Sequence, residues 1–248
     1  MAPPGSQPKF LEPLLGIVFD LDGTLVLSHH DFGRMRKEVI RLAELSGVPP
    51  GHLSVQDPIH KTVETARDEL RNAGASDGVI YRFEAEYQKH IDAIELEALP
   101  RTVPRPGAPE LLKALSQRGF RIGLLTRSSE LFARQALVRT QLAPYFEYLR
   151  SRSAPGPAKP SPEALLLLLN EMGVPVDRAV FVGDHLIDAE CGTRAHVRFY
   201  AVMPDPSEAA QSTMSEDRFL AAGASAIAKD LFELAQHLDI ASPPAVTP

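Results

Sequence analysis

The chain has 248 residues, of which 44% are hydrophobic and 23% are charged, and its formal net charge is -6. This balance is that of an ordinary globular protein, and the length suffices for one large α/β domain or for a core with a small accessory domain. The 32 acidic residues outnumber the 26 Lys and Arg residues, so the chain as a whole does not attract nucleic acid or anionic membranes. We therefore expect neither of these as a partner.

Cysteine usage and the N-terminus bear on the compartment. Cys191 is the single cysteine, which excludes an intrachain disulfide and a cysteine-rich metal site. Residues 1–13 lack the cationic start and apolar run of a signal peptide. No apolar run approaches the roughly 18 residues that a transmembrane helix needs. These features predict a cytoplasmic protein.

Short apolar runs alternate with amphipathic segments along the chain, which indicates βα units and a parallel sheet. In chain order, buried strands are expected at residues 15–19, 121–125, 179–182 and 198–202, with a weaker strand at 146–149. Helices are expected at residues 32–45, 58–72, 77–99, 108–117, 129–140 and 161–172. Asp57 and Ser128 are the predicted N-caps of the second and the fifth of these helices.

The spacing of the strands breaks once, between the first strand and the second. The intervening stretch of about 70 residues is helical and charged, and it is too long for a simple crossover. We predict an α/β fold, with a Rossmann-like parallel sheet as the core and an inserted all-helical cap. The predicted boundaries are a tail at 1–13, the core at 14–27 and 101–240, the cap at 28–100, and a tail at 241–248.

The most informative segment is IVFDLDGT, which runs from Ile17 to Thr24. A buried strand ends at Asp20, a second acid follows at Asp22, and Gly23 permits a tight turn. Ligands of parallel sheets bind at the carboxyl ends of the strands. Asp20 therefore stands where a reactive group is expected.

A second strand runs into the segment FVGDHLID, which contains Asp184 and Asp188. One turn of helix would place these two carboxylates on the same side. Together with Asp20 they would form a site of hard oxygen ligands, which suits Mg²⁺ rather than zinc.

Two further strand ends carry polar side chains. Thr126 follows the strand at 121–125 and precedes a helix, whose first backbone amides can bind phosphate. Lys159 follows the weaker strand and stands just before the helix at 161–172. All four segments fall at strand ends on one edge of the predicted sheet, so a single site can use them.

This order of motifs resembles the haloacid dehalogenase superfamily of phosphohydrolases, and within it the phosphoglycolate-phosphatase-like group. The resemblance covers about residues 14–232, including a helical cap after the first motif. It implies a Rossmann-like sheet with a mobile cap and a phosphatase activity that depends on Mg²⁺. The matched positions are, in motif order, Asp20 and Asp22, then Thr126, then Lys159, then Asp184 and Asp188.

The resemblance, together with the chemistry of these side chains, also assigns the reaction. Asp20 would attack phosphorus to give an aspartyl phosphate, and Asp22 would protonate the leaving oxygen and then activate water. The expected Mg²⁺ ligands are the Asp20 carboxylate, the Asp22 backbone carbonyl, Asp184, and Asp188 directly or through water.

The phosphoryl group would be held by a second set of residues. These are the side chains of Thr126 and Lys159 with the backbone amides of Leu21, Asp22 and Arg127. Arg127 departs from the small polar residue that many relatives carry, and its side chain either touches substrate or reaches solvent.

The expected function is hydrolysis of a small phosphorylated metabolite. A phosphomutase of the same superfamily shares the core and remains an alternative, as does a non-catalytic interaction protein that kept the fold. Asp22 and the pair of Asp184 and Asp188 argue against a haloacid dehalogenase, which uses neither Mg²⁺ nor the second acid. The substrate and the oligomeric state are not readable from these motifs, because the cap and its facing loops set specificity.

Overall fold

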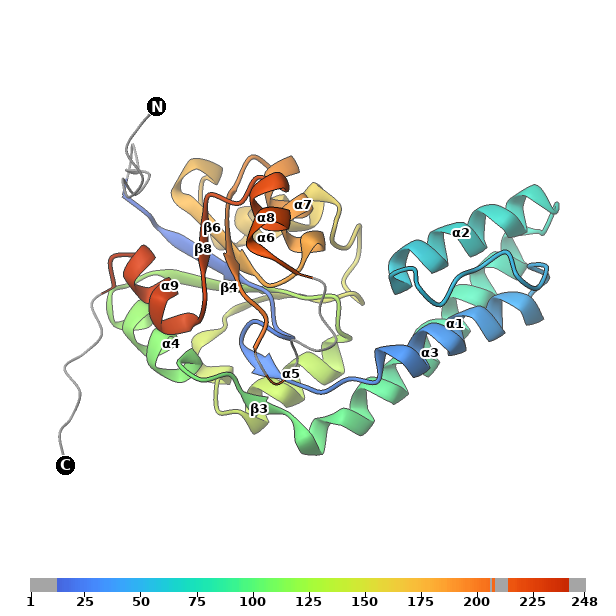
Figure 1. Cartoon of the computed structure of the whole chain (residues 1–248), viewed down its shortest axis with the longest axis horizontal. Helices are drawn as coiled ribbons and strands as arrows, with labels where there is room; N and C mark the ends of the chain where they lie inside the picture. Colours follow the sequence, from blue (N-terminus) through green and yellow to red (C-terminus); the bar gives the residue numbers. More distant parts are fainter. Residues whose placement is uncertain (1–12, 206, 208–213, 241–248) are drawn as a thin grey trace. The chain divides into compact units, whose positions relative to one another are not determined.

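The computed structural model describes residues 13–205, 207 and 214–240 (Figure 1). The predicted tails fall outside these ranges, apart from residue 13. The chain divides into two compact units, one formed by residues 1–28 and 102–248 and the other by residues 29–101.

The larger unit is built on a six-stranded sheet in the order β5-β4-β1-β6-β7-β8, in which every neighbouring pair is parallel. Its strands are β1 (Gly16–Phe19), β4 (Arg121–Leu125), β5 (Tyr148–Arg150), β6 (Ala179–Gly183), β7 (Arg198–Val202) and β8 (Ala226–Ala228). The predicted α/β fold with a parallel sheet is therefore confirmed. Phe19 pairs in register with Leu124 of β4 and with Val182 of β6, so the carboxyl ends of these three strands lie side by side.

Helices cover both faces of this sheet, which is why its central strands are continuous apolar runs rather than alternating ones. All residues of β1 and β6 are buried. Helices α4, α5 and α9 lie on one side of the sheet and α6, α7 and α8 on the other (Figure 1). Their bounds are α4 Ala108–Gln117, α5 Glu130–Arg139, α6 Pro162–Met172, α7 Leu186–Arg194, α8 Glu216–Ala221 and α9 Leu231–His237. Short 3₁₀ turns follow at η2 (Ala143–Tyr145) and η3 (Val176–Arg178).

Three strands of the larger unit were not predicted. β8 closes one edge of the sheet, and β2 (Val26–Leu27) pairs antiparallel with β3 (Val103–Pro104). Strands of two or three residues are too short to show a hydrophobic period, so only their pairing partners define them.

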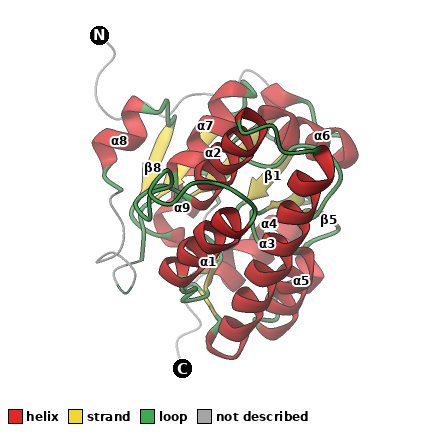
Figure 2. Ribbon diagram, turned by 90° about the vertical axis from the view of Figure 1, so that its right-hand side faces the viewer, coloured by secondary structure: helices red, strands yellow, loops and turns green. Residues whose placement is uncertain are grey.

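The smaller unit contains α1 (Phe32–Leu45), α2 (Ile59–Asn72), α3 (Asp77–Ala98) and the turn η1 (Leu99–Arg101). Helix α1 packs against both α2 and α3 (Figure 2). Each helix turns an apolar stripe inward, with Met35 and Val39 on α1 and Phe83 and Ile91 on α3 among the buried residues. The unit thereby encloses a hydrophobic core of its own.

The predicted N-cap of α2 was wrong. The N-cap position is occupied by Pro58, which makes no side-chain hydrogen bond, while Asp57 forms an ion pair of 3.3 Å with Lys61.

Within the described ranges, none of the helices combines the length and the apolarity that a bilayer crossing requires.

Candidate active site

The first motif forms a compact turn directly after β1. Asp20 is 8% exposed, and its backbone amide donates to the carbonyl of Val182 on the neighbouring strand at 2.9 Å. The amides of Leu25 and Val26 both donate to the carbonyl of Leu21, at 2.8 and 3.0 Å, which closes the turn. Asp22 and the buried residue Leu21 therefore lie within a rigid loop at the carboxyl edge of the sheet.

The fourth motif begins at the end of β6. Asp184 precedes helix α7, so it does not share a helical turn with Asp188, but the two carboxylates lie on the same side as predicted, with oxygens within 4.8 Å of each other. His185 is the N-cap of α7, and its Nδ1 accepts from the amide of Ile187 at 3.2 Å. The His185 amide donates in return to Asp188 Oδ2 at 3.2 Å. This reciprocal capping box turns Asp188 toward the sheet edge, while the Thr24 hydroxyl donates to Asp184 Oδ1 at 2.7 Å.

Three carboxylates converge at this edge. Asp20, Asp184 and Asp188 each provide an oxygen within 4.8 Å of the others. Burial raises the pKa of Asp20 well above its ordinary value, although Lys159 opposes this effect. Burial and the neighbouring Asp188 raise the pKa of Asp184 to about 7. Burial and mutual repulsion disfavour the charged form of these carboxylates unless a cation is bound. Carboxylate oxygens are the hard ligands that Mg²⁺ prefers, so the residues present fit this ion.

Lys159 is the cation of the cluster. It is 2% exposed, and its Nζ donates to Asp20 Oδ1 at 2.5 Å and to Asp188 Oδ1 at 2.7 Å. Burial alone would lower the pKa of Lys159, but Asp188 and Asp20 outweigh it and raise the pKa above its ordinary value. The ammonium therefore stays charged and neutralises one of the three carboxylates. The remaining negative charge is what a divalent cation would neutralise.

The second motif follows β4. The Thr126 Oγ1 atom accepts from the Ser128 amide at 3.0 Å. Helix α5 is capped by Ser129, whose hydroxyl accepts from the Phe132 amide at 3.3 Å, so the predicted N-cap Ser128 was wrong. The Ser128 hydroxyl donates instead to Oδ2 of Asp22. Sequence reasoning missed this contact, because a serine before a helix looks like a cap.

Three arginines hold the backbone around the cluster. Arg127 donates from Nη1 to the carbonyl of Lys159, and the Arg127 carbonyl accepts from Arg152 Nη1 at 2.7 Å. The buried Arg105 donates to the carbonyls of Gly23 and Met203, the latter at 2.5 Å. Arg105 was also missed, because a single arginine between two prolines carries no recognisable pattern.

The structure thus brings Asp20, Asp184, Asp188 and Lys159 into direct contact or close approach. It joins Asp22 to the second motif through Ser128. The chemical roles given to these residues and to Thr126 stay predictions.

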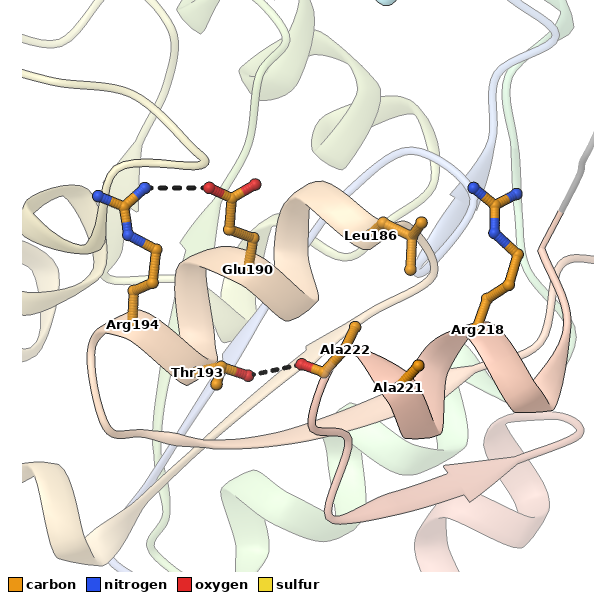
Figure 3. Close-up of a pocket in the computed structure, with 7 residues that line it drawn as sticks. All are labelled: Leu186, Glu190, Thr193, Arg194, Arg218, Ala221 and Ala222. Atoms are coloured by element: carbon orange, nitrogen blue, oxygen red, sulfur yellow. Dashed lines mark hydrogen bonds and ion pairs between the residues drawn. The ribbon is translucent and has the colours of Figure 1, made fainter.

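A separate open groove of about 500 Å³ lies between α7 and α8 (Figure 3). Thr193 donates to the carbonyl of Ala222 at 2.9 Å, and Glu190 pairs with Arg194 at 3.0 Å within its lining. The described lining of this groove contains none of the clustered carboxylates, so we assign it no part in the site.

The chain is similar in sequence and in fold to known proteins. The chain is 31% identical over 190 residues to phosphoglycolate phosphatase of Pseudomonas syringae pv. tomato, covering 75% of this chain and 68% of the relative. It is 29% identical over 194 residues to N-acetylmuramic acid 6-phosphate phosphatase of Pseudomonas aeruginosa, covering 76% and 81%. The crystal structure of a hydrolase from Pseudomonas syringae matches the fold with a TM-score of 0.65 at 21% identity, covering 92% of this chain and all of that one.

The sequence also matches the family described as haloacid dehalogenase-like hydrolase over residues 14–196, which is most of the chain. This segment includes every residue of the carboxylate cluster and Lys159. The chain belongs to the haloacid dehalogenase-like hydrolase family.

Proposed function

We propose that this chain is a Mg²⁺-dependent phosphomonoester hydrolase that works through an aspartyl phosphate on Asp20. The observation that carries the proposal is the position of Asp20 at the end of β1. Asp20 accepts a hydrogen bond from the buried Lys159 and lies close to the carboxylates of Asp184 and Asp188. A buried carboxylate among other anions needs cationic neutralisation before it can approach an anionic phosphate. The phosphatases among its relatives support the same reading.

Asp20, Asp184 and Asp188, with the backbone carbonyl of Asp22, would hold the metal ion. Bound there, Mg²⁺ would supply positive charge between the attacking carboxylate and the phosphoryl group. Lys159 adds a fixed positive charge, which remains in place because two carboxylates keep it protonated. Thr126 and the amides of Leu21, Asp22 and Arg127 complete the proposed phosphoryl pocket.

The reaction has two steps. In the first, an oxygen of Asp20 bonds to phosphorus while the bond to the leaving oxygen breaks, and the leaving oxygen takes the proton of Asp22. In the second, Asp22 accepts a proton from water as the water oxygen bonds to phosphorus. The bond between phosphorus and Asp20 then breaks, and its electron pair returns to the carboxylate.

We infer that the substrate is a small phosphorylated metabolite of the phosphoglycolate-phosphatase-like class. The relatives with phosphatase names act on two different small phosphomonoesters, which supports the class rather than one member of it. We assign residues 28–100, which contain helices α1, α2 and α3, as the cap.

The test combines an assay with a labelling experiment. Release of phosphate from p-nitrophenyl phosphate is expected to stop in EDTA and to return with Mg²⁺. Asp20→Asn is expected to be inactive and to take up no label, whereas Asp22→Asn is expected to accumulate phosphate on Asp20 because no base activates water. Asp217→Asn, at an exposed position on α8, is the control and is expected to act as wild type.

Three outcomes would contradict the proposal. Full activity in EDTA would contradict the requirement for a metal ion. Turnover by Asp20→Asn would contradict the role of Asp20 as nucleophile. Label on Asp22 would mean that Asp22, and not Asp20, is the nucleophile. Label on Asp20 without net release of phosphate would indicate a phosphomutase instead.

A further inference from the structure

Ser128 stands between the second motif and helix α5, and it is 5% exposed. Its backbone is held on both sides: the amide donates to Thr126 Oγ1 at 3.0 Å, and the carbonyl accepts from the Arg152 amide at 3.1 Å. These two bonds hold the Ser128 backbone in the loop from which its side chain reaches the first motif. That hydroxyl donates to Oδ2 of Asp22, a residue 106 positions earlier in the chain.

The local structure does not require this hydroxyl. Ser129 caps the helix, and the Thr126 side chain bonds the turn that leads into it. A buried hydroxyl needs a hydrogen-bond partner, and the partner of Ser128 is the side chain that the mechanism uses for proton transfer. The contact links the loop after β4 to the loop after β1, so it forms only when both strand ends are in place.

We propose that Ser128 is a positioning residue for Asp22, which it orients for proton donation to the leaving oxygen. This inference rests on the proposed function, because it assumes that Asp22 is the acid of the first step. As the bond between phosphorus and the leaving oxygen breaks, its electron pair goes to that oxygen, which takes the proton from Asp22. Negative charge then develops on the Asp22 carboxylate, and the Ser128 hydroxyl is placed to donate to one of its oxygens.

The proposal has a consequence that a purely structural role lacks. Proton donation matters most when the leaving oxygen is strongly basic and least when it departs readily. Loss of the Ser128 hydroxyl is therefore expected to slow poor substrates more than good ones. For Ser128→Ala we expect kcat/KM to fall roughly tenfold or more with phenyl phosphate, and by about threefold or less with p-nitrophenyl phosphate.

The experiment measures kcat/KM for a series of aryl phosphates of graded leaving-group basicity, with saturating Mg²⁺. The slope of log(kcat/KM) against the pKa of the leaving phenol is expected to be steeper in Ser128→Ala than in wild type. Ser128→Cys, a near-isosteric and weaker donor, is expected to steepen it as well. Ser128→Thr retains a hydroxyl and is expected to restore the wild-type slope.

Ser129→Ala is the matched control, because it removes the neighbouring hydroxyl, which accepts the capping hydrogen bond of α5 from the Phe132 amide. It is expected to lower the melting temperature and to leave the slope unchanged. An unchanged slope in Ser128→Ala and Ser128→Cys, or an equal change in Ser129→Ala, would overturn the positioning role alone. Absence of phosphatase activity in the wild type would overturn the proposed function and this inference together.

Discussion

A Cβ atom built on Gly23 would lie 2.2 Å from the Oδ2 atom of Asp184, which is far inside van der Waals contact. Gly23 also has a φ of +82°, in the left-handed region that disfavours side chains. The turn of the first motif therefore presses its backbone directly against a carboxylate of the cluster. A side chain at this position would have to displace Asp184, because Thr24 in the same turn also holds that carboxylate.

Gly23→Ala is expected to lower phosphatase activity by roughly a hundredfold, because a displaced Asp184 removes one of the charges that hold the metal. Mg²⁺ is expected to raise the melting temperature of the wild type, and the added methyl group is expected to abolish that rise. Gly119→Ala is the matched control, since Gly119 has a φ of +76° and its Cβ would meet open space. The control is expected to lose about 1 kcal/mol of stability and to retain its activity. Equal behaviour of the two variants would show that backbone strain, and not the contact with Asp184, is responsible.

Lys159→Ala is expected to lower the rate by roughly a hundredfold, by analogy with the loss of one stabilising donor in other enzymes. The ammonium bonds to both Asp20 and Asp188, so its removal leaves two buried carboxylates without their cation. Lys113→Ala, at an exposed position on α4, should retain full activity. The measurement is steady-state phosphate release at saturating Mg²⁺, and a rate for Lys159→Ala within about threefold of wild type would place this lysine outside the chemistry.

The stability of the metal-free protein is expected to depend on pH through the carboxylate cluster. Burial raises the pKa of Asp184 to about 7, and burial also raises the pKa of Asp20. In the unfolded chain both pKa values return to about 4, so the folded protein binds more protons between about pH 4 and pH 7. This contribution to stability is present on the acid side and is lost as the pH rises through 7.

Two measurements check this dependence. In EDTA, the melting temperature is expected to fall between pH 5.5 and pH 8, and Asp184→Asn should reduce that fall. Because Mg²⁺ binds the deprotonated carboxylates, the increase in melting temperature that it causes should be larger at pH 8 than at pH 5.5. An increase that does not change with pH would mean that Mg²⁺ binds elsewhere.

Cys191 is expected to be unreactive in the folded protein. It is buried on α7, its Sγ atom donates to the carbonyl of Ser161 at 3.3 Å, and burial raises its pKa to about 12. At pH 8 the native protein should therefore not react with Ellman's reagent, whereas the protein in urea should react fully. The chain has a single cysteine, so the signal reports on this residue alone. Rapid reaction of the native protein would contradict the buried placement of α7.

The sequence determined the elements whose signal is local. The strands at 121–125 and 198–202 and the helices at 32–45 and 108–117 were predicted with the bounds that the structure shows. Each of them spans enough residues for its hydrophobic period to be read from side chains alone. The predicted parallel sheet also brought the motif residues to one edge, because the carboxyl ends of parallel strands share an edge.

Short elements and single-residue boundaries escaped prediction for a physical reason. The strands at 26–27, 103–104 and 226–228 exist through pairing with a distant segment, which their own residues do not specify. Ser128 and Ser129 have the same intrinsic capping ability, so the geometry of the loop decides which of them caps α5.

The contacts within the candidate site were decided by tertiary structure. Lys159 and Asp20 are 139 residues apart, Ser128 and Asp22 are 106 apart, and Arg105 and Gly23 are 82 apart. The strand order places β4 beside β1 and β5 beside β4, which brings the loops of Ser128 and Lys159 to the first motif, while pairing of β3 with β2 brings Arg105 to it. The residue types at the strand ends could be read from the sequence, whereas the pairing of one with another required the folded sheet.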